Sequence, residues 1–114
     1  MNRRTGDFNS IFIASLQEAM GKALGRWKAE VILNHIKKIG GLDLSDIPEK
    51  LSDFDVVLKA LLGEEGGIAI ENMIIEEVYS RIGVRPEIRL EWGFPEYIEH
   101  AKMIYITKER IGVE

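Results

Sequence analysis

The stretch from Gly66 to Gly83 constrains the fold most, because its apolar residues recur at helical spacing over more than four turns. At 100° per residue they fan out from one line of a helix and cover about half of its circumference. These residues are Ile68, Ile70, Ile74, Ile75, Val78, Tyr79 and Ile82. A face this wide has to contact several neighbours. We therefore expect a central helix inside a helical domain.

Composition places the chain among single globular domains. It has 114 residues, of which 46% are hydrophobic and 30% charged. The absence of cysteine excludes disulfides, thiolate nucleophiles and cysteine-ligated metal centres. A net charge of −4 disfavours a broad nucleic-acid-binding surface. No signal-peptide or membrane-spanning pattern is present, so we expect a cytoplasmic protein, and the plentiful Lys, Arg and Glu favour a thermophilic source.

The N-terminal half predicts two helices after a loose polar leader at residues 1–8. Asn9 or Ser10 can cap a helix that runs to about residue 20. Gly21 and Gly25 predict a bend, or two short helical pieces, before a second helix over residues 26–39. Gly40 and Gly41 end that helix, and residues 42–48 form a connector with a short turn.

The next signals surround the central helix. Ser52 to Asp55 resembles a capping box and predicts a helix to about Leu62. Residues 63–67 contain three glycines and predict a break before the central helix, which ends at Gly83. The alternation of apolar residues at 84–90 predicts one short extended segment. The prediction is thus a mainly all-α, single-domain bundle of about five helices.

The C-terminal segment, residues 92–112, predicts the last helix and a self-association element. Pro95 suits the start of a helix, and an apolar seam follows over roughly two heptads. Aromatic side chains are enriched at interfaces, so we expect this segment to contact a partner subunit, giving a homo-oligomer such as a dimer. The predicted interface residues are Trp92, Phe94, Tyr97, Ala101 and Ile104.

Between Ala19 and Gly83 the chain carries an ordered series of glycine and apolar signals: Ala19-Met20-Gly21, Ala29…Ile32-Leu33…His35, Gly40-Gly41-Leu42, Ile47-Pro48, Phe54…Leu58…Leu61…Gly63 and Ile70-Glu71…Ile74…Tyr79…Ile82-Gly83. This series resembles a small archaeal family of unknown function related to the Nitrosopumilus output domain class. The resemblance implies an all-helical small domain, found alone or as an output module in signalling proteins. It brings no catalytic residues and does not extend past Gly83.

Candidate chemical groups are few. Two histidines, His35 and His100, lack the carboxylate partners of a metal site, so we expect structural roles for both and no metal or cofactor. A small internal pocket is a further hypothesis, with residues Trp27, His35, Tyr79 and Tyr105. The glutamates around the central helix predict a solvated acidic face, since their spacing does not converge. They are Glu64, Glu65, Glu71, Glu76 and Glu77.

These observations favour a non-enzymatic module that senses a ligand, regulates or binds a protein. No nucleophile–base arrangement supports an enzyme. The alternative is a winged-helix-like transcriptional regulator, with residues 52–62 as recognition helix and 84–90 as wing. That helix offers Asp53, Asp55 and only Lys59, whereas helices that enter a DNA groove usually carry several cations or amides. Nucleic acid is therefore the less favoured partner.

Overall fold

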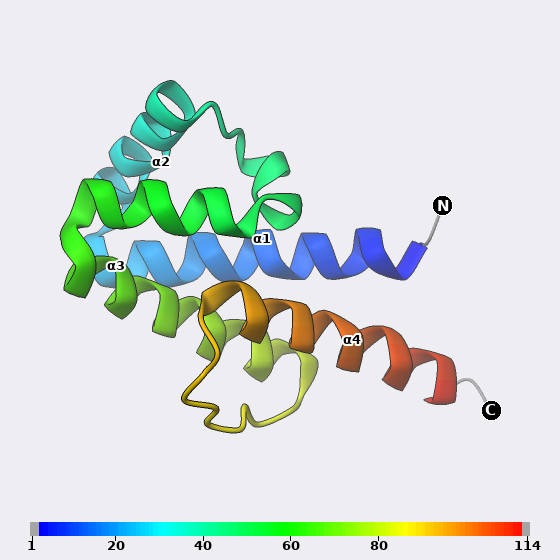
Figure 1. The fold of residues 1–114 in the computed structure, drawn as a ribbon. Helices are drawn as coiled ribbons and strands as arrows, with labels where there is room; N and C mark the ends of the chain where they lie inside the picture. Colours follow the sequence, from blue (N-terminus) through cyan, green and yellow to red (C-terminus); the bar gives the residue numbers. More distant parts are fainter. Residues whose placement is uncertain (1–2, 113–114) are drawn as a thin grey trace.

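In the computed structural model, which describes residues 3–112, the chain forms four α-helices and one 3₁₀ helix, and those residues contain no β-strand (Figure 1). The elements are α1 (Arg3–Leu24), α2 (Arg26–Gly40), η1 (Leu44–Glu49), α3 (Leu51–Ile82) and α4 (Phe94–Gly112). Side chains are described for residues 5–108. The predicted all-α bundle of about five helices is confirmed.

Helix α1 begins earlier than the sequence predicted. The segment interpreted as a loose leader is helical from Arg3, so that interpretation is wrong for its described part. The reason is Phe8, which lies one turn before Phe12 and is buried against the ring of Tyr105 at 6.1 Å between centroids. At its other end the helix runs through Gly21 and stops at Gly25, whose φ of 85° is the left-handed backbone that glycine tolerates.

Helix α2 and η1 lie at the edge of the bundle. Only Ala29 and Ile36 of α2 are buried. In η1, Ile47 and Pro48 are buried, and the Asp46 carboxylate accepts a hydrogen bond from the Asp43 N–H at 3.2 Å. These two elements therefore contribute few buried side chains to the common core.

Helix α3 consists of two helical segments that meet at Gly63, where φ is 83° and ψ is 164° (Figure 1). The chain changes direction at this residue, and the parts of the two segments nearest to it lie close together. The predicted break is thus confined to one glycine, and Glu64 to Gly67 belong to the second segment. The predicted capping box is wrong, because α3 already begins at Leu51 and Asp55 pairs with Lys59 instead.

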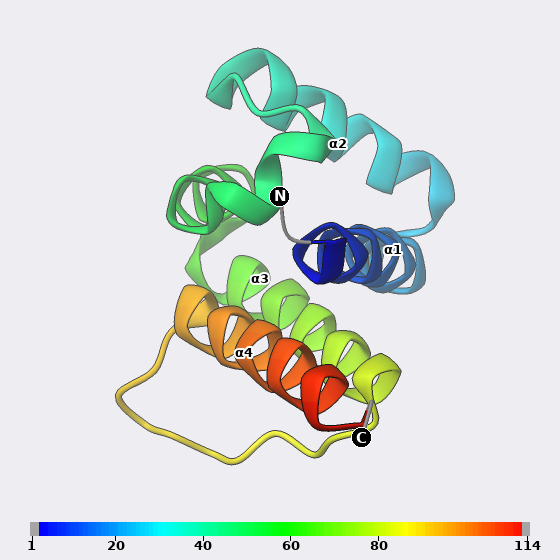
Figure 2. The ribbon, with the colours of Figure 1, turned by 90° about the vertical axis from the view of Figure 1, so that its right-hand side faces the viewer.

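The second segment of α3 is the central helix that the sequence predicted. It lies between α1 and α4, the two helices with which α3 makes most of its contacts (Figure 2). Its apolar side chains are buried from Ile70 to Ile82, while Ile68 is partly exposed. Gly83 ends the helix in left-handed conformation, as expected.

A loop over residues 84–93 joins α3 to α4. The predicted extended segment forms no strand, and the loop ends in a turn in which the Trp92 N–H donates to the Arg89 carbonyl at 3.1 Å. The following helix, α4, lies along the second segment of α3 and returns the chain to the core (Figure 2). The turn therefore carries Trp92 to the start of α4, beside the site described below.

Candidate functional site

The two segments of α3 lie close to each other at Gly67. A Cβ atom on this residue would lie 2.6 Å from Lys59 Cγ and 3.1 Å from Lys59 Cα. Cβ atoms essentially never approach other atoms to 2.6 Å, and a contact of 3.1 Å is also unusually tight. Only glycine fits here, and its small size lets the Lys59 side chain reach the helix turn that carries Glu71.

Three carboxyl groups surround the Lys59 ammonium group. Its Nζ lies 3.0 Å from Asp55 Oδ1 and 3.9 Å from both Glu64 Oε2 and Glu71 Oε1. One cation therefore faces three acids, and the cluster carries an excess of negative charge when all of them are ionised. Asp55 and Lys59 are one helical turn apart, whereas Glu71 comes from the second segment of α3.

Glu71 is the buried acid of this cluster, with 4% of its surface exposed. Burial and the adjacent Asp55 carboxylate raise the pKa of Glu71 from 4.5 to about 8. A hydrogen bond from Glu71 and the nearby Lys59 lower the pKa of Asp55. Among the described residues, Asp55 Oδ1 and Glu71 Oε2 have no aligned hydrogen-bond donor. The raised pKa of Glu71 favours its protonated form, which can donate a hydrogen bond to the Asp55 carboxylate.

A pocket of about 200 Å³ opens beside Glu71. Its polar wall comes from the two segments of α3, and its aromatic wall comes from the end of the loop and the start of α4. The lining residues are Lys59, Ile68, Glu71, Asn72, Ile75, Trp92, Gly93, Phe94 and Tyr97. The pocket thus combines a buried carboxyl group with aromatic rings, an arrangement that suits a small molecule with one charged or polar end.

The aromatic wall is held in place by contacts on several sides. Trp92 meets Tyr97 edge to face at 5.3 Å between centroids, and the guanidinium group of Arg89 lies 5.1 Å from the Trp92 ring centroid. Trp92 also contacts His100 at 4.9 Å. The Tyr79 hydroxyl donates to the Tyr97 carbonyl at 2.8 Å and lies 3.0 Å from His100 Nδ1. Burial raises the pKa of Tyr79 to about 12, so this phenol stays protonated.

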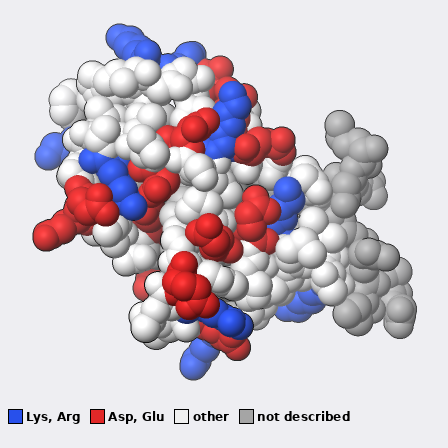
Figure 3. All heavy atoms as spheres, in the orientation of Figure 1, with Lys and Arg blue, Asp and Glu red and all other residues white. Residues whose placement is uncertain are grey.

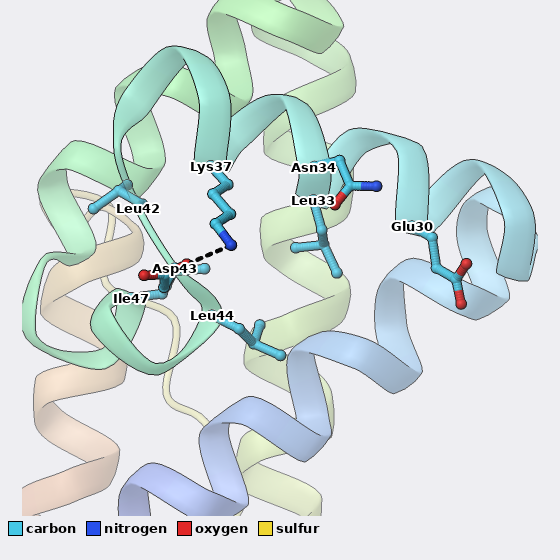
Figure 4. Close-up of a pocket in the computed structure, with 8 residues that line it drawn as sticks. All are labelled: Glu30, Leu33, Asn34, Lys37, Leu42, Asp43, Leu44 and Ile47. Atoms are coloured by element: carbon cyan, nitrogen blue, oxygen red, sulfur yellow. Dashed lines mark ion pairs between the residues drawn. The ribbon is translucent and has the colours of Figure 1, made fainter.

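A second, more open pocket of about 350 Å³ lies between α2 and η1 (Figure 4). Leu33 and Leu44 point into it from the two elements, and Lys37 pairs with Asp43 at 3.3 Å at its rim. None of its charged residues is buried. The Glu71 pocket is the stronger candidate because it alone of these two contains a buried titratable group.

The predicted internal pocket is not formed as a unit. Trp27 is 75% exposed, and His35 is also exposed on the same peripheral helix α2. Tyr79 is buried between α3 and α4, while Tyr105 packs against Phe8 near the start of α1. The prediction was wrong for Trp27 and His35. Both belong to the apolar face predicted for α2, but that helix buries only part of this face.

The predicted interface residues mostly face the protein's own core. Phe94 is buried and contacts the rings of Phe12 and Phe54 at 6.3 and 5.8 Å, and Ala101 is also fully buried. Ile104 is partly buried against the same core. Trp92 and Tyr97 instead line the Glu71 pocket. The apolar seam of α4 therefore makes intramolecular contacts, and the self-association of this segment stays a prediction.

The acidic cluster is the part of the site that the sequence did not reveal. Glu71 was interpreted as part of a solvated face, which is wrong for this residue and correct for Glu76. A signal was present, since Glu71 lies three and four residues before Ile74 and Ile75 and so falls within the apolar arc of the helix. Its partners Asp55 and Lys59 lie before the break at Gly63, in the first segment of α3. The spacing of apolar residues does not predict how the two segments lie relative to each other.

Three further observations concern metal-binding groups, membrane-spanning helices and surface charge. Among the described residues, no group of three or more His, Cys, Asp and Glu side chains is arranged to hold a metal ion. Within the same part of the chain, every helix is too short or too polar to span a membrane. On the face drawn in Figure 3, acidic and basic side chains are interspersed, and no continuous basic surface is visible there.

Comparison with protein-family models, curated proteins and solved structures gives no match to this chain. The resemblance to an archaeal family related to the Nitrosopumilus output domain class stays a prediction.

Proposed function

We propose that this protein is a non-enzymatic ligand-sensing module that binds a small organic cation, such as a primary amine, in the Glu71 pocket. The observation that carries the proposal is the buried Glu71 carboxyl group at the wall of a pocket of about 200 Å³. A regulatory role and a cytoplasmic location belong to the same proposal. The latter agrees with a sequence that has no cysteine.

Charge supports a cationic ligand. Three carboxyl groups face the single Lys59 cation, so a further cation near them would offset the excess negative charge of the cluster. A bound cation would favour ionised Glu71 and release its proton to solvent. Binding would therefore exchange one positive charge for another, with little net change in the buried charge.

The opposite wall supports the organic part of such a ligand. Trp92 and Tyr97 offer ring surfaces to which alkyl or aromatic groups bind, and their electron-rich faces attract cations. Asn72 adds an amide on the α3 side. The pocket volume limits the ligand to a small molecule.

The DNA-binding alternative receives no support from the geometry. Residues 84–90 form no strand and thus no wing, and Lys59, the cation of the would-be recognition helix, is held among carboxylates. We therefore do not propose it.

Binding of benzylammonium to the purified protein tests the proposal. In a Trp27→Phe background, Trp92 is the only tryptophan, so its fluorescence reports on the pocket directly. We expect a saturable change with benzylammonium and none at equal concentration with benzyl alcohol or benzoate. Calorimetry at pH 7 in buffers of different ionisation enthalpy should detect proton release on binding.

Glu71→Gln should abolish this binding, since the amide keeps the size of the side chain but cannot become an anion. The matched control is Glu76→Gln, which changes an exposed glutamate of the same helix and should leave binding intact. The proposal fails if benzylammonium leaves Trp92 fluorescence unchanged, or if benzyl alcohol or benzoate changes it equally. It also fails if Glu71→Gln binds benzylammonium as well as the unmodified pocket does.

A further inference from the structure

The loop between α3 and α4 exposes large apolar side chains in an alternating pattern. Ile88 and Leu90 are 87% and 95% exposed. In an extended chain they share one face with Pro86, while Glu87 and Arg89 share the other. The sequence is that of a strand with one apolar face and one charged face, yet it forms no strand within this chain.

The backbone of this loop has one occupied edge and one open edge. The Tyr97 hydroxyl accepts a hydrogen bond from the Arg89 N–H at 2.8 Å and donates to the Arg89 carbonyl at 3.2 Å. Because peptide groups are planar and trans, the Ile88 carbonyl and the Leu90 N–H point to the opposite edge. Among the described residues, no backbone group bonds to Ile88 or Leu90.

We propose that residues 86–90 pair with the same residues of a second copy of the chain as antiparallel strands, with Ile88 of both copies at the two-fold axis. In this register the Ile88 N–H and carbonyl groups of the two copies bond reciprocally, and each Leu90 N–H donates to the opposite Pro86 carbonyl. Pro86 has no N–H to donate, so the opposite Leu90 carbonyl gains no bond in return and the paired strands end at this residue.

The charged face selects a second copy as the partner. With Ile88 on the axis, Glu87 of each copy lies opposite Arg89 of the other. Within one chain these two side chains already pair at 2.8 Å, so dimerisation would join two such pairs into one network of alternating charge. A parallel arrangement in register would place Glu87 against Glu87 and Arg89 against Arg89, and would be disfavoured.

Exchange of the charges tests the proposed register. Glu87→Lys alone places cations opposite each other, and Arg89→Glu alone places anions opposite each other. In sedimentation equilibrium, each variant should dimerise at least about tenfold more weakly than the unmodified chain. An equimolar mixture of the two variants should recover association as a heterodimer, because all opposing charges are again of opposite sign.

A single cysteine provides a second measurement that does not depend on charge. The chain has no native cysteine, and antiparallel residues that exchange both hydrogen bonds lie about 5.5 Å apart at Cα, within reach of a disulfide. Ile88→Cys should therefore form a disulfide-linked dimer under mild oxidation at least about tenfold faster than Ile39→Cys, which places a thiol at an exposed site on α2.

Lys38→Glu is the matched control for charge, since it makes a similar change on exposed α2 and should leave association unaltered. The proposal is overturned if the unmodified chain is monomeric at millimolar concentration. It is also overturned if the mixed variants fail to associate, or if Ile88→Cys cross-links no faster than Ile39→Cys.

Discussion

Helix α4 and the loop that precedes it are both rich in apolar residues, but the fold uses them in opposite ways. Phe94, Ile98 and Ala101 of α4 are buried against α1 and α3. Ile88 and Leu90 of the loop are almost fully exposed, although both are large apolar side chains. The helix therefore contributes to the stability of the monomer, whereas the loop is available for contacts with a second copy.

The largest effect on stability should come from truncating a buried side chain of α4. Phe94→Ala removes a ring that contacts both Phe12 and Phe54, and we expect a loss of about 4 kcal/mol in the free energy of unfolding. Urea denaturation followed by circular dichroism measures it. A loss below about 1 kcal/mol would mean that α4 does not depend on its apolar seam.

The next largest effect on stability should come from the buried carboxyl group of Glu71, and this effect should depend on pH. The pKa of Glu71 is about 8 in the folded state and about 4.5 when the group is exposed, so the folded state binds the proton more strongly. Its contribution to stability is fully present below pH 4.5 and is lost as the pH rises towards 8. Glu71→Gln removes this loss and should stabilise the protein at pH 9 by on the order of 3 kcal/mol.

Unfolding of Glu71→Gln and the unmodified chain at pH 6 and pH 9 would measure this difference. Glu76→Gln provides the exposed counterpart and should behave like the unmodified chain at both values. Equal pH profiles for Glu71→Gln and the unmodified chain would contradict the assignment of Glu71 as a protonated buried acid.

A smaller loss should follow from closing the gap between the two segments of α3. Gly67→Ala places a methyl group against the backbone of Lys59 and should cost about 2 kcal/mol in stability. Gly21→Ala makes the same change in α1, where nothing lies within 4 Å, and should gain up to about 1 kcal/mol. Thermal unfolding of the pair measures both, and a loss at Gly21 equal to that at Gly67 would refute the steric explanation.

Truncating an exposed side chain of the loop should have the smallest effect on stability. Leu90→Ser removes a side chain that is 95% exposed, so the free energy of unfolding of the monomer should change by less than about 0.5 kcal/mol. Denaturation at micromolar concentration measures it. A loss of several kcal/mol would show that the loop contributes to the monomer core and would remove the distinction from α4.

The sequence predicted the elements better than their neighbours in space. The period of residues 66–83 correctly identified a central helix, and Gly25 and Gly83 end helices because their left-handed backbone interrupts helical hydrogen bonding. Apolar spacing also located α4, but not the surface that it contacts. A seam that binds a partner and a seam that binds its own core have the same pattern.

The candidate site could not be predicted from spacing, because it depends on the turn at Gly63. Asp55 and Glu71 are separated by sixteen positions and meet only because the chain changes direction at Gly63. The strand predicted at residues 84–90 failed for a related reason: alternation indicates which face is apolar, but a strand forms only where a second strand is present.

The Tyr97 hydroxyl sets a limit on assembly through the loop. A strand with two open edges can accept a new copy on each side and grow without end, as aggregating proteins do. One edge at Arg89 is already occupied by this phenol, which bonds both the N–H and the carbonyl. Pairing of two copies through the remaining edge leaves no open edge at this residue, so the proposed assembly closes at two chains.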